Sequence, residues 1–146
     1  MQKIIIDTNV MVSSLIQKSF PYKIVSELFI EDKIKLCISE NLMAEYYEVL
    51  RRPKFAAYYD FAARAETLLA DIATKAIMFC PQIKIDLLSD KDDNMILELA
   101  HDSKADFIIT GNTTDFTIAN YQQTKIVTPK EYWLLYTNYL PHFCGE

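Results

Sequence analysis

The chain has 146 residues, of which 51% are hydrophobic and 24% charged. This composition supplies enough apolar material for one compact domain over residues 1–146 and argues against intrinsic disorder. The formal net charge of −5 argues against a protein that coats nucleic acid through a broad basic surface. It leaves open an enzyme whose acidic residues hold divalent cations in a cleft, because a bound cation reverses the local potential felt by a phosphate.

The sequence shows no signal for export or for a membrane span. The isoleucine run after Lys3 is far shorter than the hydrophobic region of a secretory signal. Later apolar runs are broken by charged residues before they reach the ~18–20 residues needed to cross a bilayer. Cys37, Cys80 and Cys144 are odd in number and lack C-x-x-C spacing, which favours reduced thiols over disulfides or a zinc site. We therefore expect a cytoplasmic protein that does not contact a membrane.

Short β-branched runs and helical periodicity predict the elements in chain order. In the first half we expect a strand at 3–6, helices at 10–17 and 22–31, a strand at 35–38, and a helix at 40–51 that Ser39 caps and Pro53 ends.

In the second half the periodicity predicts a long amphipathic helix, followed by shorter elements. These are a helix at 60–79 with Asp60 as its cap, a strand at 83–85, a helix from Asp92 or Asp93 to His101, strands at 107–110 and 125–127, and a helix at 129–136.

This order predicts an α/β fold, in which a central and mainly parallel β-sheet is flanked by helices on both faces. Ligands in such sheets bind at the carboxyl ends of the strands, near a switch in strand order. Asp7 follows the first predicted strand, and the segment 110–115 follows the strand that begins at Phe107. Both are therefore expected at that edge of the sheet.

Acidic residues stand at several of these strand ends and helix starts, namely Asp7, Glu45, Asp92 with Asp93, and Asp115. Each alone has an ordinary explanation, as a helix cap, a solvated helix residue, a partner of a helix dipole or a turn residue. Together they suit a hard divalent cation, which needs several oxygen ligands. Such cations activate water and stabilise charge in phosphodiester cleavage. Motifs for rival chemistry, such as a P-loop or G-x-S-x-G, are absent from the sequence.

Several segments then resemble one family when taken together. They are IIIDTNV at 4–10, SENLMAEYYEVLRRPKF at 39–55, DKDDNMILELA at 90–100, ADFIITGN at 105–112 and IVTPKEYW at 126–133. In their order and spacing the sequence resembles the PIN-domain family, specifically the bacterial and archaeal toxins of toxin–antitoxin pairs. The resemblance implies a PIN-like fold and an endoribonuclease that hydrolyses RNA phosphodiester bonds by metal-activated water. It also implies Mg²⁺ or Mn²⁺ as cofactor and a small antitoxin protein as partner, and leaves a homodimer open.

The resemblance also assigns site residues. In this family the first-strand Asp, a helix Glu and the Asp that opens a later helix bind metal, which maps onto Asp7, Glu45 and Asp93. Many members have an Asp directly after the T-G of the later strand, where this chain has Asn112. Asp115 is the next acid and is taken as the fourth metal-binding and catalytic residue. The departure puts the fourth ligand, and with it a second metal, in question.

Four further residues are expected to orient these ligands or a metal-bound water, and they are Asn9, Thr110, Asn112 and Asp92. Asn9 has the alternative of a simple helix cap, and Asp90 and Asp92 share the roles of cap and supporting group.

Two sets of residues have both a structural and a functional interpretation. The basic residues at the end of one helix, Arg51, Arg52 and Lys54, either complement its dipole or contact phosphate. The tyrosines either pack in a core or a dimer seam or stack on RNA bases, and they are Tyr46, Tyr47, Tyr58 and Tyr59. The alternative functions are a catalytically silent PIN-like adaptor and a receiver-like regulatory module whose acidic tip binds one Mg²⁺. The late-strand Lys expected of receivers is missing, which argues against the latter.

Overall fold

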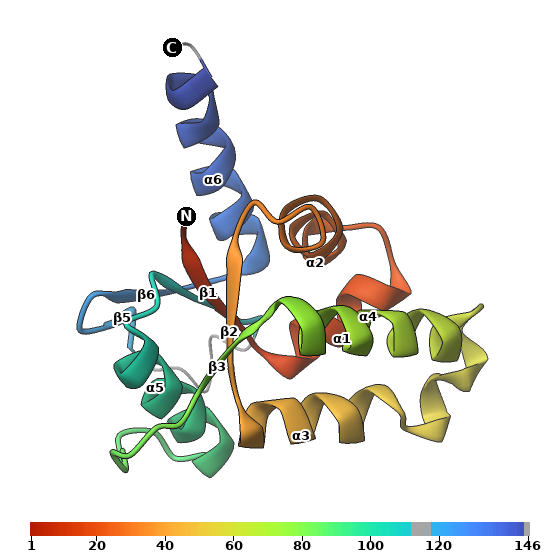
Figure 1. Cartoon of the computed structure of the whole chain (residues 1–146), viewed down its shortest axis with the longest axis horizontal. Helices are drawn as coiled ribbons and strands as arrows, with labels where there is room; N and C mark the ends of the chain where they lie inside the picture. The colour runs from red at the N-terminus through yellow and green to blue at the C-terminus, as the bar shows by residue number, and fades with distance from the viewer. Residues whose placement is uncertain (112–117, 145–146) are drawn as a thin grey trace.

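The computed structural model describes the backbone of residues 1–111 and 118–144, and the side chains in these ranges up to residue 138. A six-stranded sheet has the order β3-β2-β1-β4-β6-β5 (Figure 1). The strands are β1 (Lys3–Ile6), β2 (Lys35–Ser39), β3 (Ile77–Phe79), β4 (Phe107–Ile109), β5 (Asn120–Tyr121) and β6 (Thr124–Val127). The helical elements are α1 (Thr8–Ile16), α2 (Phe20–Lys23), the π-helix η1 (Ile24–Phe29), α3 (Glu40–Leu50), the 3₁₀-helix η2 (Pro53–Ala57), α4 (Phe61–Lys75), α5 (Lys91–Ser103) and α6 (Pro129–Cys144).

The sheet is mainly parallel, and helices cover both of its faces. Among the described strands only β5 and β6 pair antiparallel, while the other four pairs are parallel. Ile4, Ile5 and Ile6 of the central β1 are fully buried, as expected for a strand covered on both faces. Figure 1 shows α5 and α6 on opposite sides of the strands, and the ring of Tyr132 in α6 packs 5.1 Å from that of Phe107 in β4. The predicted α/β fold is confirmed.

The direction of the strand order changes beside β1. From β1 the chain adds β2 and β3 on one side, and then β4 and β6 on the other. The carboxyl ends of β1 and β4 are neighbours, because Ile6 pairs with Ile109. The backbone N–H of Asp7 donates a hydrogen bond of 3.0 Å to the carbonyl oxygen of Ile109, which extends this pairing by one residue. Asp7 therefore lies at the switch in strand order, where open α/β sheets bind their ligands.

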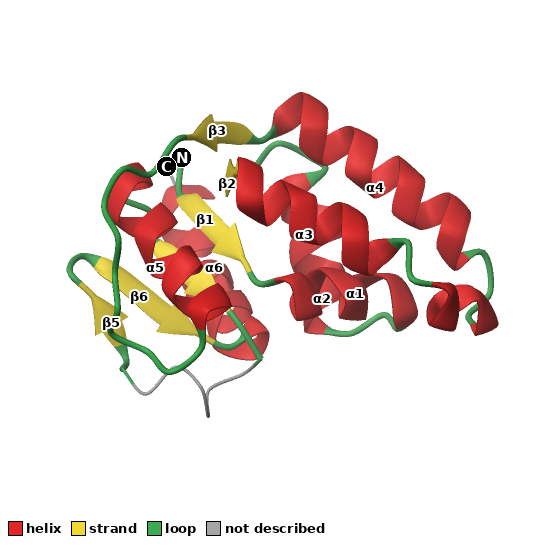
Figure 2. Cartoon of the chain, turned by 90° about the horizontal axis from the view of Figure 1, so that it is seen from below, coloured by secondary structure: helices red, strands yellow, loops and turns green. Residues whose placement is uncertain are grey.

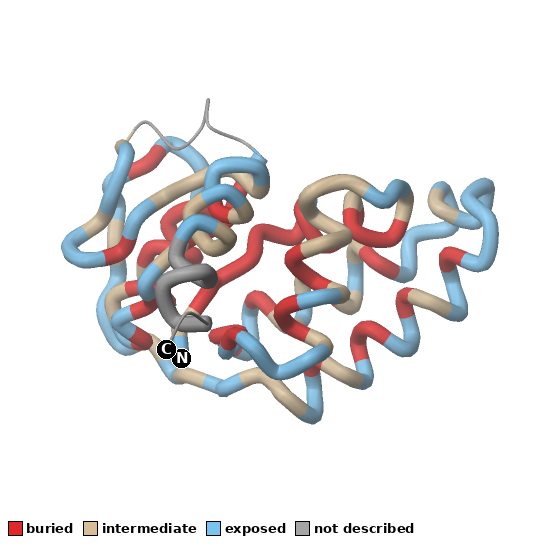
Figure 3. Tube along the Cα trace, turned by 90° about the horizontal axis from the view of Figure 1, so that it is seen from above, coloured by how far each residue is buried: buried red, intermediate tan, exposed pale blue. Residues whose placement is uncertain are grey.

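Helices α1, α3 and α4 pack beside the sheet (Figure 2). In α3 the buried residues Leu42, Tyr46 and Leu50 recur every four positions, which gives the helix one apolar stripe. Ser39 begins the helix, since its hydroxyl accepts a hydrogen bond of 3.2 Å from the backbone N–H of Leu42. Figure 3 shows the buried segments running through the central strands and the inward sides of these helices. The predicted strand 3–6, the cap Ser39 and the helix after it are confirmed.

The expected helix at 60–79 is wrong at its C-terminal end. Helix α4 ends at Lys75, and Ile77–Phe79 forms β3, which pairs in parallel with β2. The apolar residues of this run favour a strand once a sheet edge is available, and helical periodicity alone does not reveal that edge. Asp60 has a φ of 56° and makes no capping hydrogen bond through its side chain. It is therefore not the cap that the sequence predicted.

Other boundaries also differ from the prediction. The expected strand at 83–85 is absent, and the backbone N–H of Ile85 instead donates to a carboxylate oxygen of Glu98 at 2.9 Å. The expected helix at 22–31 is divided into α2 and η1. The hairpin strand β5 was not predicted, and α6 continues beyond the predicted end at residue 136.

Candidate active site

Asp7 is the first residue of the candidate site, and its surroundings are not those of an ordinary helix cap. Its backbone occupies the N-cap position of α1, but its side chain makes no capping hydrogen bond. Instead Oδ2 accepts a hydrogen bond of 2.8 Å from the hydroxyl of Thr110, the residue that follows β4. The side chain is only 9% exposed. The carboxylate is thus held between the ends of two central strands by a contact from Thr110, and a role for Thr110 in metal binding stays a prediction.

Glu45 approaches the same strand end from α3. Its Oε2 accepts a hydrogen bond from the hydroxyl of Thr8, the residue next to Asp7. Burial raises the pKa of Glu45, and the charges of Asp92 and Asp7 raise it further, although the bond from Thr8 acts in the opposite direction. Carboxylates from a strand end and two helices therefore repel one another at this point of the fold.

Tyr46 fixes the position of α3 relative to β1. Its hydroxyl donates a hydrogen bond to the carbonyl oxygen of Ile6, the residue before Asp7. The side chain is fully buried, and burial together with the charges of Asp7 and Glu45 raises its pKa well above the ordinary value. The hypothesis that Tyr46 stacks on RNA bases is therefore wrong, and Tyr46 is a packing residue that joins α3 to the end of β1.

The N-terminus of α5 brings the third acidic group. Asp90 is the cap, because its Oδ1 accepts a hydrogen bond of 2.8 Å from the backbone N–H of Asp92. The helix thus begins one residue earlier than expected, at Lys91. Asp93 is 7% exposed, whereas Asp92 is exposed to solvent. The charges of both Asp92 and Asp7 raise the pKa of Glu45 beyond the effect of burial, so Asp92 lies near Glu45 as Asp7 does.

The remaining predicted residues have less structural support. Asn112 and Asp115 lie outside the described residues. Asn9 is in the first turn of α1 with an exposed side chain, and no hydrogen bond from this side chain to another described residue is present. Asn9 therefore does not orient Asp7 through a direct contact in this structure.

Comparison with known protein families identifies the family to which this chain belongs. The PIN domain family matches residues 3–114. The chain belongs to the PIN domain family. Asp7, Glu45, Asp93 and Thr110 all lie within the matched region, and Asp115 lies one residue beyond it.

Two other proteins resemble this PIN domain over most of its length. The uncharacterized protein MJ1680 of Methanocaldococcus jannaschii is 30% identical over 139 residues, which cover 89% of this chain and 88% of that protein. A chain in the crystal structure of VapBC2 from Rickettsia felis, bound to a DNA fragment from their promoter, matches with a TM-score of 0.55 and 15% identity. That match covers 86% of this chain and 97% of the other, and it supports the fold.

The acidic residues of the candidate site are of the type that binds a hard divalent cation. Asp7, Glu45 and Asp92, whose charges act on one another, carry carboxylate oxygens, the ligands that Mg²⁺ and Mn²⁺ prefer, and Asp93 follows Asp92 in the first turn of α5. Burial and then the charges of Asp92 and Asp7 raise the pKa of Glu45, and a bound dication would offset both effects. Within residues 1–111 and 118–144, no three His, Cys, Asp or Glu side chains are already arranged to hold a metal ion. Thr8 and Thr110 each donate a hydrogen bond to one carboxylate oxygen, of Glu45 and of Asp7 respectively.

The arginines at the end of α3 are engaged in surface ion pairs. Arg51 contacts both carboxylate oxygens of Glu66, at 2.8 and 2.9 Å, and Arg52 contacts Glu48 at 2.8 Å. Arg51 also lies 4.7 Å from the ring centre of Tyr47. These contacts favour a structural role for both arginines over phosphate binding.

The remaining expectations for this PIN domain concern the redox state of its cysteines and the lack of a membrane-spanning helix. Cys37 is buried and Cys80 exposed, and both are free thiols, while the side chain of Cys144 lies outside the described residues. Burial raises the pKa of Cys37 to about 11, so its thiol stays protonated near neutral pH. In the part of the chain that the structure describes, every helix is too short or too polar to cross a membrane.

Proposed function

We propose that this PIN domain is a metal-dependent endoribonuclease and the toxin of a toxin–antitoxin pair that acts in the cytoplasm. The observation that carries the enzymatic part is the position of Asp7. Its carboxylate makes no capping hydrogen bond to α1 and instead accepts a hydrogen bond from Thr110. Its charge, like that of Asp92, raises the pKa of Glu45. Glu45 is half-buried beside the like charges of Asp7 and Asp92, an arrangement that costs stability, so its place at a ligand-binding edge favours a function over a purely structural role.

The residues of the chain have separate roles in this proposal. Asp7, Glu45 and Asp93 hold Mg²⁺ or Mn²⁺, with Asp115 as the fourth carboxylate and Asp92 beside them. The bound cation lowers the pKa of a water molecule and neutralises charge that develops on the phosphate.

The supporting residues keep these ligands in place. Thr110 and Thr8 orient Asp7 and Glu45 through hydrogen bonds, and Tyr46 holds α3 against β1. The N-terminus of α5 carries partial positive charge, which offsets part of the repulsion among the acids.

The toxin role rests on sequence resemblance. The segments around Asp7, Glu45 and Asp93 resemble PIN toxins whose activity a small antitoxin protein restrains. The fold shared with a chain of VapBC2 is compatible with this role. RNA is the proposed substrate, and an antitoxin is the proposed protein partner.

A cleavage assay tests the proposal against a catalytically silent adaptor. Single-stranded RNA is incubated with the protein in Mn²⁺, in Mg²⁺ and in excess chelator, with Asp7→Asn as the variant and the exposed Asp102→Asn as the matched control. We expect cleavage in either metal, none in chelator, and a large loss with Asp7→Asn only. Intact RNA in all metal conditions would favour the adaptor.

A further inference from the structure

A cavity of about 620 Å³ lies directly beside the acidic cluster. It is bounded by the start of α3, the segment 84–86 and the first two turns of α5. Glu45 and Asp92 belong both to its wall and to the candidate active site. The cavity is therefore continuous with the place where the proposed cleavage occurs.

One wall of this cavity is irregular backbone that α5 holds in place. Oδ1 of the buried Asn94 accepts hydrogen bonds from the backbone N–H groups of Leu87 and Leu88, at 3.2 and 2.8 Å, and its Nδ2 donates to the carbonyl oxygen of Leu88 at 2.8 Å. Glu98 accepts from the backbone N–H of Ile85 at 2.9 Å. Lys84, the residue before Ile85, is thereby attached to a fixed segment and not to a free loop.

The cavity contains two lysines that lack a structural explanation. Lys84 and Lys91 both line it and are exposed. Although acids also line the wall, neither ammonium group lies within 4.0 Å of a carboxylate among the described residues. Lys91 is the first residue of α5, where the positive end of the helix dipole disfavours a cation. Both charges remain available to an anionic ligand.

We propose that this cavity receives the RNA strand next to the cleaved bond, and that Lys84 and Lys91 bind its phosphates. The inference rests on the proposed nuclease function and adds the path of the substrate to it. A polyanion that approaches Glu45 and Asp92 is repelled by them, so fixed cations beside them lower the cost of approach. RNA is favoured over an acidic peptide because the cavity shares Glu45 and Asp92 with the site where we propose that RNA is cleaved.

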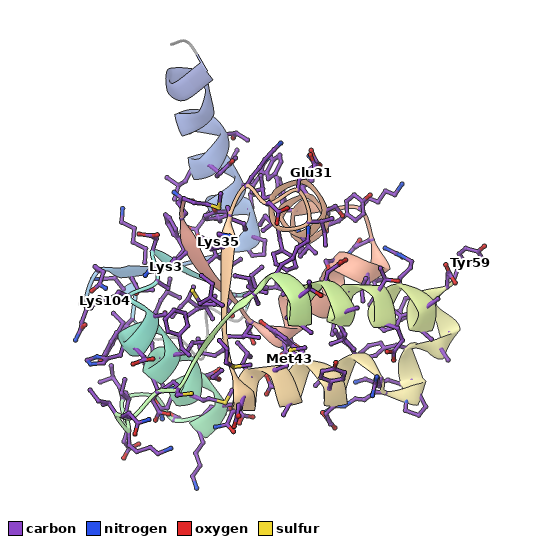
Figure 4. All side chains as sticks on the ribbon, viewed as in Figure 1. Lys3, Glu31, Lys35, Met43, Tyr59 and Lys104 are labelled. Carbon is purple, nitrogen blue, oxygen red and sulfur yellow. The ribbon has the colours of Figure 1, made fainter. Side chains whose placement is uncertain are left out.

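The binding test uses the double variant Lys84→Gln/Lys91→Gln in an Asp7→Asn background, so that RNA stays intact while its affinity is measured. Its matched control, Lys35→Gln/Lys125→Gln, removes the same charge from exposed lysines at the amino ends of β2 and β6. Figure 4 shows Lys35 at one end of β2 and Met43, in α3, beyond the other end of that strand. A third variant, Lys84→Arg/Lys91→Arg, keeps the charge.

In Mn²⁺ buffer we expect the glutamine double variant to bind single-stranded RNA at least about tenfold more weakly at 0.1 M salt. The slope of log affinity against log salt should fall by about 1.4, since each phosphate contact to a single strand contributes about 0.7. The control should change little, and the arginine variant should bind like the parent. With Asp7 restored, the glutamine pair should raise KM and leave kcat nearly unchanged.

Three results would overturn the inference. If the wild type cleaves RNA and the glutamine pair matches the control in affinity and salt slope, the lysines do not bind RNA, although the nuclease function stands. If the pair keeps RNA affinity but loses binding to a protein antitoxin, the cavity is a protein site. If the wild type neither binds nor cleaves RNA in Mn²⁺, the nuclease function and the inference fail together.

Discussion

Thr110 at the end of β4 donates a hydrogen bond of 2.8 Å to Asp7 at the end of β1, across 103 positions of the sequence. The contact exists because β1 and β4 are paired in parallel and end at the same level, with Ile6 opposite Ile109. The hydroxyl of Thr110 is thus part of the candidate active site, whereas its neighbours in β4 belong to the core.

Replacing Thr110 with Val should therefore affect both stability and activity. The methyl group that replaces the hydroxyl has a similar volume but leaves Oδ2 of Asp7 without this donor, which should cost about 1–3 kcal/mol of unfolding free energy in chelator. Cleavage should fall at least about tenfold, since the carboxylate loses its orientation. Thr110→Ser, which keeps the hydroxyl, is the control. Urea unfolding and cleavage rates equal to those of the wild type would show that the bond orients nothing.

The pKa of Glu45 predicts how stability depends on pH without metal. Burial and the charges of Asp92 and Asp7 raise this pKa above its ordinary value of 4.5, so the folded state favours the protonated form. Stability should therefore fall as pH rises from about 4.5 through the raised pKa, because ionised Glu45 is less favourable in the folded protein. Glu45→Gln removes this charge, keeps an acceptor for Thr8 and should stabilise the metal-free protein near pH 7.

Urea unfolding in chelator between pH 4 and pH 8 checks this prediction, with Glu27→Gln as a control at an exposed position. The advantage of Glu45→Gln should shrink toward the acidic end of the range. The same variant should lose cleavage in Mn²⁺, because an amide adds no negative charge for the cation. A Glu45→Gln protein that is less stable than the wild type at pH 7 in chelator would show that Glu45 is not under repulsion.

Asp115 is our proposal for the fourth carboxylate, because Asn112 occupies the position where the family often has an Asp. An amide oxygen can bind a hard cation but adds no charge, so a second metal depends on Asp115. Asp115→Asn should reduce cleavage at least about tenfold, which corresponds to ~1.4 kcal/mol of barrier, and raise the required metal concentration. Asn112→Asp should be tolerated or activating. Unchanged rate and metal dependence in Asp115→Asn would leave a three-carboxylate site.

Features of this protein that depend on neighbouring residues could be predicted from its sequence. The isoleucine run of β1 and the cap Ser39 depend on neighbouring residues and are as predicted, and so is the amphipathic pattern of the long helix up to Ile72. That Asp7 follows a strand was equally evident, because a buried β-branched run ends at the preceding residue. The position of Asp7 at the switch in strand order followed from the general rule for α/β sheets.

Features that depend on tertiary contacts could not be predicted from the sequence. Ile77–Phe79 continues a helical pattern in sequence and becomes a strand only because the edge of β2 is available. In the sequence Asn94 is an ordinary polar residue near the start of a helix. Its buried side chain accepts hydrogen bonds from the backbone of residues 87 and 88 only because the fold brings that segment against α5. Likewise Asp92 and Asp93 are adjacent and identical in type, and only the fold separates the exposed one from the buried one.

The central claim is that the carboxylates from β1, α3 and α5 bind the metal that supports RNA cleavage. Titrating Mn²⁺ into the wild type, Asp7→Asn and Asp93→Asn by calorimetry, with Asp102→Asn as the control, tests this most directly. We predict that the wild type and the control bind Mn²⁺ equally, that both site variants bind at least tenfold more weakly, and that the wild-type cleavage rate rises with the same midpoint as binding. Equal Mn²⁺ affinity in the wild type and Asp7→Asn, or RNA cleavage that persists in chelator, would contradict the claim.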